Sequence, residues 1–199
     1  MAERNVTLAD PRVELPSMSR AYVVPSSNTA KPGESEALEV LAFVLGHGTT
    51  SRLYRTLVVD RQLAVAAGGW YSGNALDATE FGVFGSPKPG VSLVKLEEAI
   101  DAVIDDVVAK GLTSDEVERA KNRLIADAIY AKDNQATMAR WFGTALTTGM
   151  TVESVQTWPD RMRAVTADAV NAAAKTWLDK RHSATGFLMR APHREEKRS

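Results

Sequence analysis

Cysteine is missing from this sequence of 199 residues. Its absence excludes thiol catalysis, disulfide bridges and cysteine-ligated metal in one step. It leaves the compartment open, because a chain without cysteine is stable in either redox environment.

Long apolar runs are missing as well. No stretch of about 18 apolar residues occurs, so no segment is predicted to span a membrane. The first residues, Met1 to Asn5, lack the apolar core of a signal peptide. An export signal would have been lost, however, if the chain were a piece cut from a longer one.

Neither sign of charge dominates. The 24 basic and 25 acidic side chains give a net charge of −1. This balance argues against nucleic acid as the main partner, because duplex binding needs a concentrated basic surface. With 44% hydrophobic and 25% charged residues, the composition is that of one globular domain rather than of a disordered chain.

Histidine is scarce, and the three that occur, His47, His182 and His193, are far apart. Zinc hydrolysis needs two or three imidazoles or carboxylates that converge on the metal, and a carboxylate that takes a proton from bound water. The Gly-x-Ser-x-Gly elbow of serine hydrolases is also absent. We therefore predict no catalytic and no metal-binding residue in this chain.

Two further groups of residues are predicted to be structural. The consecutive acidic pairs at 97–98 and 105–106 point in two directions from one helix, and we expect them on its solvated face. The tryptophans are dispersed over four elements, which favours packing in the core or at an interface over a stacking surface. They are Trp70, Trp141, Trp158 and Trp177.

Hydrophobic periodicity predicts an α+β fold. Thr113 and Glu116 have the spacing of a capping box at the start of a long helix. Strands and helices do not alternate regularly, so we expect a mainly antiparallel sheet with helices packed on one face. Strands are predicted at 13–24, 63–71, 79–85 and 183–189, and helices at 34–46, 51–60, 93–111, from 113 towards 144, from 152 and from 167.

One domain is predicted, at residues 12–190. Residues 1–11 show no apolar period, and residues 191–199 contain a charged run after Pro192. We expect both ends to be solvated tails.

One stretch resembles a family signature. Residues 45–57 read Leu-Gly-His-Gly-Thr-Thr-Ser-Arg-Leu-Tyr-Arg-Thr-Leu, and residues 60–64 read Asp-Arg-Gln-Leu-Ala. With the strand segment 82–85 and the helix segment 116–124, their order and spacing resemble the second domain of pitrilysin/insulinase-type zinc peptidases. That family includes mitochondrial processing peptidase and its bacterial relatives, and the resemblance covers roughly residues 12–190.

The resemblance implies a partner domain. In the family, zinc is bound in the first domain by an inverted His-x-x-Glu-His motif and a downstream Glu, and that motif is absent here. Zinc is therefore expected in a missing N-terminal domain. The family also implies a homologous subunit, in a homo- or heterodimer, and a chamber that admits unfolded peptides. Bacterial peptidases of this kind are often exported, which favours the periplasm and leaves the cytoplasm as the alternative.

The resemblance also assigns positions to candidate site residues. In the family an Arg and a Tyr seven residues later help to hold the substrate carbonyl, and Val58 and Val65 occupy those positions here. Valine can neither donate a hydrogen bond nor polarise a carbonyl. Arg52, Tyr54 and Arg55 are candidate substrate contacts instead, with a salt-bridged helix surface as the alternative.

Our functional hypothesis is a non-catalytic domain of a zinc metalloendopeptidase, inactive when alone. It would shape the substrate chamber and support peptide binding and subunit pairing. The alternative is an inactive structural or assembly subunit of the same family, as the respiratory-complex core proteins are. A third possibility is an unrelated α+β binding domain.

Overall fold

A single sheet runs through the part of the chain that the computed structural model describes, residues 4–191. Its strands are β1 (Arg4–Asp10), β2 (Ser17–Val24), β3 (Ala64–Tyr71), β4 (Thr79–Pro87) and β5 (Ser183–Arg190). They lie in the order β1-β5-β2-β4-β3. Neighbouring strands are antiparallel except for β1 and β5, which are parallel. The prediction of a mainly antiparallel sheet is confirmed.

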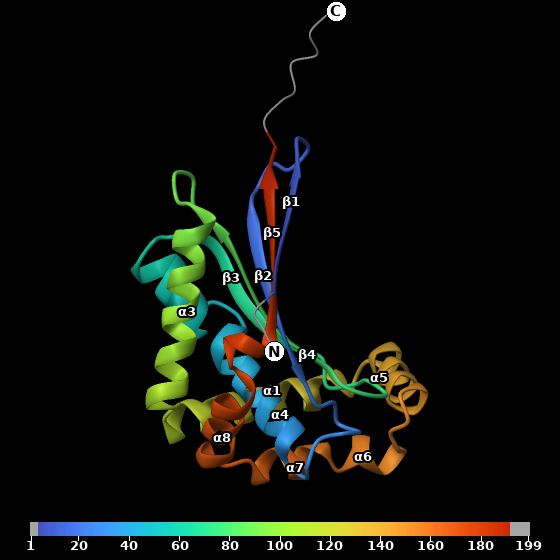
Figure 1. Ribbon diagram of the computed structural model, residues 1–199. Coiled ribbons are helices and arrows are strands. Elements are labelled where there is room, and N and C mark those ends of the chain that lie inside the picture. Colours follow the sequence, from blue (N-terminus) through green and yellow to red (C-terminus); the bar gives the residue numbers. More distant parts are fainter. Residues whose placement is uncertain (1–3, 192–199) are drawn as a thin grey trace, which may run out of the picture.

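Helices cover one face of this sheet. They are α1 (Glu34–Gly46), α2 (Arg52–Tyr54), α3 (Leu93–Lys110), α4 (Ser114–Ala131), α5 (Gln135–Thr147), α6 (Val152–Gln156), α7 (Trp158–Ala164) and α8 (Ala167–Trp177). A π-helical turn η1 (Arg55–Asp60) continues α2, and a 3-10 turn η2 (Lys180–His182) precedes β5. α1 packs on β3, α3 on β2 and β4, and α8 on β2. On the opposite side the upper sheet is bare, and α5 and α6 extend below it (Figure 1).

The core lies between the helix layer and the sheet. Leu38, Leu41 and Leu45 recur along one side of α1 and are fully buried, as helical spacing of apolar residues requires. They belong to the same hydrophobic cluster as Tyr22 of β2 and Phe81 of β4.

A buried arginine ties the sheet to α3. The Arg20 side chain on β2 is 1% exposed, and it donates to Glu97 Oε1 at 2.6 Å and to Asp101. Its Nε donates to Thr185 of β5 at 2.9 Å. Lys180 Nζ lies 2.8 Å from Asp101 Oδ2. Because a buried guanidinium needs partners for its charge, Glu97 has a structural role and does not lie on the solvated face as predicted.

Side-chain caps explain where several helices begin. The predicted capping box of Thr113 and Glu116 is formed, and Thr151 and Thr166 cap α6 and α8. The long helix predicted towards residue 144 is broken, however. α4 ends at Ala131, and Asn134 accepts a hydrogen bond from the Thr137 backbone to start α5.

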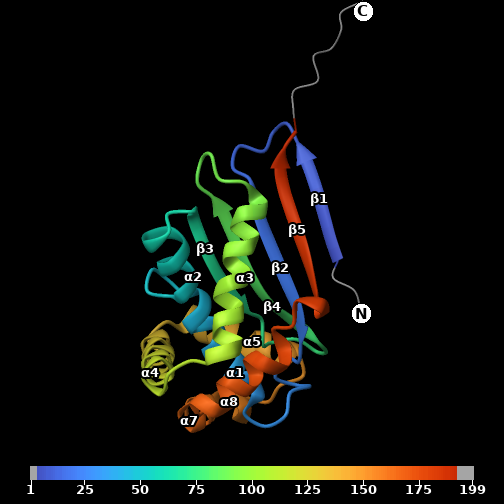
Figure 2. The same ribbon diagram turned by 60° about the vertical axis from the view of Figure 1, so that its left-hand side comes forward.

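The first residues differ from the predicted tail at 1–11. Residues 4–10 form β1, paired in parallel with β5 from Arg4 and Ala184 to Asp10 and Arg190. The side chains of β1 are almost all exposed, so only the backbone pairing holds the strand. Figure 2 shows β1 at the outer edge of the sheet. Of the C-terminal tail predicted at 191–199, residues 192–199 lie outside the described residues.

No helix in residues 4–191 combines the length and the apolar character that a membrane span needs.

Candidate functional site

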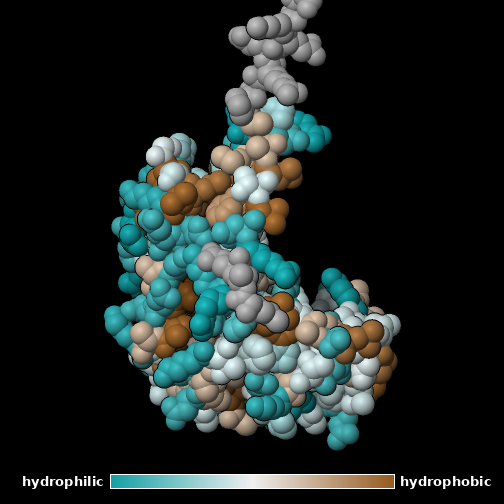
Figure 3. Space-filling model, viewed as in Figure 1, coloured by the Kyte–Doolittle hydropathy of each residue, from teal (hydrophilic) through white to brown (hydrophobic). Residues whose placement is uncertain are grey.

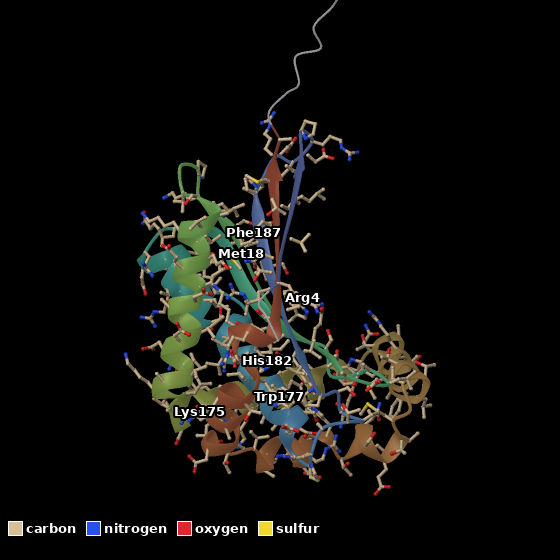
Figure 4. All side chains as sticks on the ribbon, viewed as in Figure 1. Arg4, Met18, Lys175, Trp177, His182 and Phe187 are labelled. Carbon is tan, nitrogen blue, oxygen red and sulfur yellow. The ribbon has the colours of Figure 1, made fainter. Side chains whose placement is uncertain are left out.

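The two histidines that the structure describes do not contribute to a common metal site. His47 is exposed and stacks on Phe43, with ring centroids 4.5 Å apart. His182, labelled in Figure 4, lies just before β5 with Nδ1 3.6 Å from Asp179 Oδ2. His193 lies outside the described residues. Within residues 4–191 no three His, Asp or Glu side chains are placed to hold a metal ion.

Arg52 joins three helices. Its Nε and Nη2 donate to the two carboxylate oxygens of Glu116 on α4, both at 2.9 Å, and Nη1 donates to Asp106 on α3 at 3.4 Å. This bidentate pair holds the pKa of Glu116 at about 2, below its usual 4.5, with further help from the Thr113 backbone and hydroxyl. The guanidinium is thus engaged within the fold.

The other two candidate contacts differ in exposure. Tyr54 is half-buried, whereas Arg55 is exposed. The Arg55 side chain forms no hydrogen bond or ion pair within residues 4–191. Of the candidate contacts, Arg55 is therefore the side chain that is available to a partner.

Val58 and Val65 are aliphatic groups in different environments. Val58 lies in η1 and packs against the core, whereas Val65 on β3 is 44% exposed. Neither offers a polar atom for a substrate carbonyl. Their side chains fit the role of spacers rather than of ligands.

The glycine in the signature stretch permits a close approach. A Cβ on Gly46, at the end of α1, would lie 1.8 Å from the backbone nitrogen of Gly69 on β3. The helix end and the strand are therefore in backbone contact, which only glycine allows. Gly48, two residues later, adopts φ +72° and turns the chain towards α2.

The bare side of the sheet is apolar, and we name it the open face. One row of directly paired residues crosses all five strands on it: Val6, Gly186, Ser19, Phe84 and Gly68. Directly paired residues share a face of the sheet. The paired Met18 and Phe187, labelled in Figure 4, belong to the opposite face.

Exposed apolar side chains gather on the open face. Val6 is 66% exposed, Leu8 61% and Phe84 38%. Val6 and Leu8 border a shallow depression of about 270 Å³ with Ser17, Ser19 and Leu188. Figure 3 shows a wide concavity on the right-hand side of the molecule, with hydrophobic residues above and below it. Exposed apolar patches of this kind mark contact surfaces.

Small residues let two aromatic rings lie on the open face. A Cβ on Gly82 would be 2.1 Å from the indole of Trp70, and one on Gly68 would be 2.7 Å from the ring of Phe84. The two rings are 6.1 Å apart, and Trp70 Nε1 donates to Glu80 Oε1 at 3.0 Å. An aromatic pair held in this way is a rigid contact surface.

This surface was not predicted from the sequence. Apolar and small residues alternate in 64–71 and 79–87, but the packing of α1 and α3 decides which alternate set of side chains faces the helices. The exposed β1, which contributes Val6 and Leu8, was not predicted as a strand at all.

The comparison with family models decides the relationship. The model described as "Peptidase M16 inactive domain" matches residues 2–124. The chain belongs to the peptidase M16 inactive-domain family. The resemblance to pitrilysin/insulinase-type zinc peptidases is thereby confirmed.

One relative of this inactive domain is a longer protein. An uncharacterized zinc protease of Streptomyces coelicolor is 34% identical over 148 residues, which are 74% of this chain and 32% of that protein. The chain thus spans about a third of that relative.

Two solved structures share the fold. A protease from Helicobacter pylori has a TM-score of 0.86 at 21% identity, over 94% of this chain and 44% of that one. A chain in complex III from Candida albicans has a TM-score of 0.78 at 14% identity, over 94% of this chain and 46% of that one. At these identities the likeness concerns the fold alone.

Proposed function

We propose that this inactive domain forms part of the substrate chamber of a zinc metalloendopeptidase whose metal is held by a separate N-terminal domain. The observation that carries the proposal is the open face, an exposed apolar surface on the side of the sheet opposite the buried core. Support also comes from the family and from the zinc-protease relative, which is more than twice as long.

The chemistry of the open face suits unfolded peptides. Trp70 and Phe84 offer flat apolar area, because their rings lie over Gly82 and Gly68. Apolar side chains of a peptide would be removed from water there, which would contribute about 25 cal/mol of favourable binding free energy for each Å² of apolar area buried. Cleavage would then be a property of the whole assembly, in which this domain pairs with its own zinc domain and with a homologous subunit.

Arg55 is the residue we propose as a polar substrate contact. It is exposed on η1, whereas the nearby Arg52 is held by Glu116. Tyr54 would contribute only the part of its ring that is exposed. Val58 and Val65 leave the carbonyl-binding role to the partner subunit.

The test replaces an open-face ring in the longer protein that contains this domain. Phe84→Asp should lower kcat/KM for an unfolded peptide by about tenfold, through lost apolar contact worth roughly 1.4 kcal/mol. Val94→Asp is the control, because Val94 is 63% exposed on α3 and away from the open face. Unchanged kcat/KM in a folded Phe84→Asp protein would contradict the proposal.

A second candidate is a structural subunit without proteolytic activity, which the shared fold with a complex III chain favours. The parent reading frame separates the two. A His-x-x-Glu-His motif upstream, with zinc bound and peptide cleaved by the purified assembly, supports the peptidase. A folded, paired assembly that neither binds zinc nor cleaves peptide supports the structural subunit.

A further inference from the structure

A second feature lies away from the open-face row, beneath the sheet. A partly open cavity of about 390 Å³ is lined by α1, the end of β3 and the helices from α4 to α7. Trp141, Trp158, Met150 and Leu124 supply much of its apolar wall. Its volume lies within the range of small-ligand sites.

Two carboxylates from α1 line this cavity, and in the part of the chain that the structure describes only Glu36 forms an ion pair. Glu36 is buried, and its Oε1 accepts from Arg161 Nε at 2.7 Å. Arg161 Nη1 donates to the Ser154 carbonyl at 2.9 Å and to the Thr157 hydroxyl at 2.7 Å. Arg161 is therefore engaged by groups of its own surroundings.

Glu39 is the carboxylate that forms no ion pair within residues 4–191. Its Oε2 accepts from Trp158 Nε1 at 2.9 Å. Its Oε1 accepts no hydrogen bond within residues 4–191, and no side chain there forms an ion pair with it. The nearby Tyr71 hydroxyl donates elsewhere, to the Pro25 carbonyl at 2.8 Å. A charged acceptor on the wall of an apolar cavity attracts a donor that carries positive charge.

We propose that this cavity binds a protonated amine or a guanidinium carried on an apolar stem. The head would donate to Glu39 Oε1, and the stem would lie between Trp141 and Trp158, where indole faces favour cations. Anions would be repelled by Glu36 and Glu39. This inference is independent of the chamber proposal, because it concerns a different set of residues.

The proposal carries a pH dependence. Burial raises the pKa of Glu39 to about 7; Trp158 opposes this rise, Glu36 adds to it and Arg161 opposes it. The other titratable groups on the cavity wall are Tyr71 of β3, whose pKa burial also raises, and Asp127 of α4. A bound cation favours ionised Glu39, so the ligand displaces its proton. Affinity should rise as the pH increases from 6 to 8, roughly across that pKa.

Benzylamine is the probe, with benzyl alcohol as its neutral counterpart. At pH 8 we expect benzylamine to bind the 199-residue chain about tenfold more tightly than benzyl alcohol does, because only the amine forms the charge-assisted hydrogen bond. Tryptophan fluorescence reports binding, because two of the four tryptophans line the cavity. Calorimetry in two buffers of different ionisation enthalpy should show proton release at pH 7, and this readout needs no variant.

Glu39→Gln should abolish both the preference for the amine and its pH dependence. Glu153→Gln, which removes an exposed carboxylate on neighbouring α6 outside the cavity wall, should retain both. Equal binding of benzylamine and benzyl alcohol, or no binding of either by the wild type, would overturn the proposal.

N-acetyl-lysinamide and a lysine-containing hexapeptide distinguish the sources of the amine. Tighter binding of the hexapeptide than of benzylamine assigns the cavity to a basic side chain of a peptide. Equal or weaker binding assigns it to a free amine. Both outcomes uphold the cation site, and failure of the Phe84→Asp test would leave it untouched.

Discussion

At the residue scale, Gly46 sets the distance between α1 and the sheet. An added Cβ would meet backbone atoms of Gly69 at 1.8 Å and 2.3 Å, and backbone cannot rotate away as a side chain can. The close packing of the end of α1 against β3 therefore depends on the absence of a side chain at position 46.

Opposite results are expected from the same substitution at two glycines. Gly46→Ala should lower the free energy of unfolding by about 3 kcal/mol through overpacking. Gly143→Ala, in α5 with no atom within 4 Å of the added Cβ, should raise it by roughly 0.5–1 kcal/mol through helix propensity. Urea denaturation measures both, and a stable Gly46→Ala protein would refute the close contact.

At the element scale, Arg52 holds α2 against α3 and α4, and its effect should depend on pH. Glu116 has a folded pKa of about 2 and a usual value of 4.5. The pair therefore stabilises the fold fully above about pH 4.5, and this contribution is lost as the pH falls towards 2.

Arg52→Met should accordingly reduce the free energy of unfolding at pH 7 by about 1–2 kcal/mol, since both partners are mostly shielded from solvent. The difference from the wild type should shrink towards pH 3. Arg55→Met, at an exposed arginine three residues later, serves as the control with little change at either pH. If the difference in free energy of unfolding between the wild type and Arg52→Met stayed constant with pH, the ion pair with Glu116 would be excluded as the source of the stabilisation.

Elements with strong local signals could be predicted from the sequence. The apolar period of α1, the capping box of α4 and the β-rich segment of β3 each sit within a few residues of where they were expected. β1 was missed because its exposed side chains leave no burial pattern, and it exists through pairing with β5. The break at Lys132 to Asn134 was missed because it contains neither glycine nor proline.

The candidate sites were harder to predict from the sequence, because each joins residues that are distant along the chain. Glu39 and Trp158 bond across 119 positions, and the open-face row draws one residue from each of five strands. Such groupings are products of topology. Composition and local periodicity describe each residue but do not show which distant residues lie beside it in the fold.

At the scale of the whole molecule, the open face predicts self-association of the isolated chain. Exposed Val6, Leu8 and Phe84 would be covered by a second copy when no natural partner is present. Sedimentation velocity should show a concentration-dependent dimer, weakened by Leu8→Lys. Val94→Lys, on α3, should leave the dimer unchanged. A chain that stays monomeric at high concentration would contradict this prediction.

The parallel pairing of β1 with β5 joins the two ends of the chain in one sheet. Arg4 lies opposite Ala184, and β5 separates β1 from β2. During synthesis β1 leaves the ribosome well before β5, and within residues 4–191 β5 is the one strand that pairs with β1. Pairing over such a sequence distance closes a large loop late in folding. β1 should therefore be secured after the other strands of this sheet, and its amide hydrogens should exchange with solvent before those of β2 and β4.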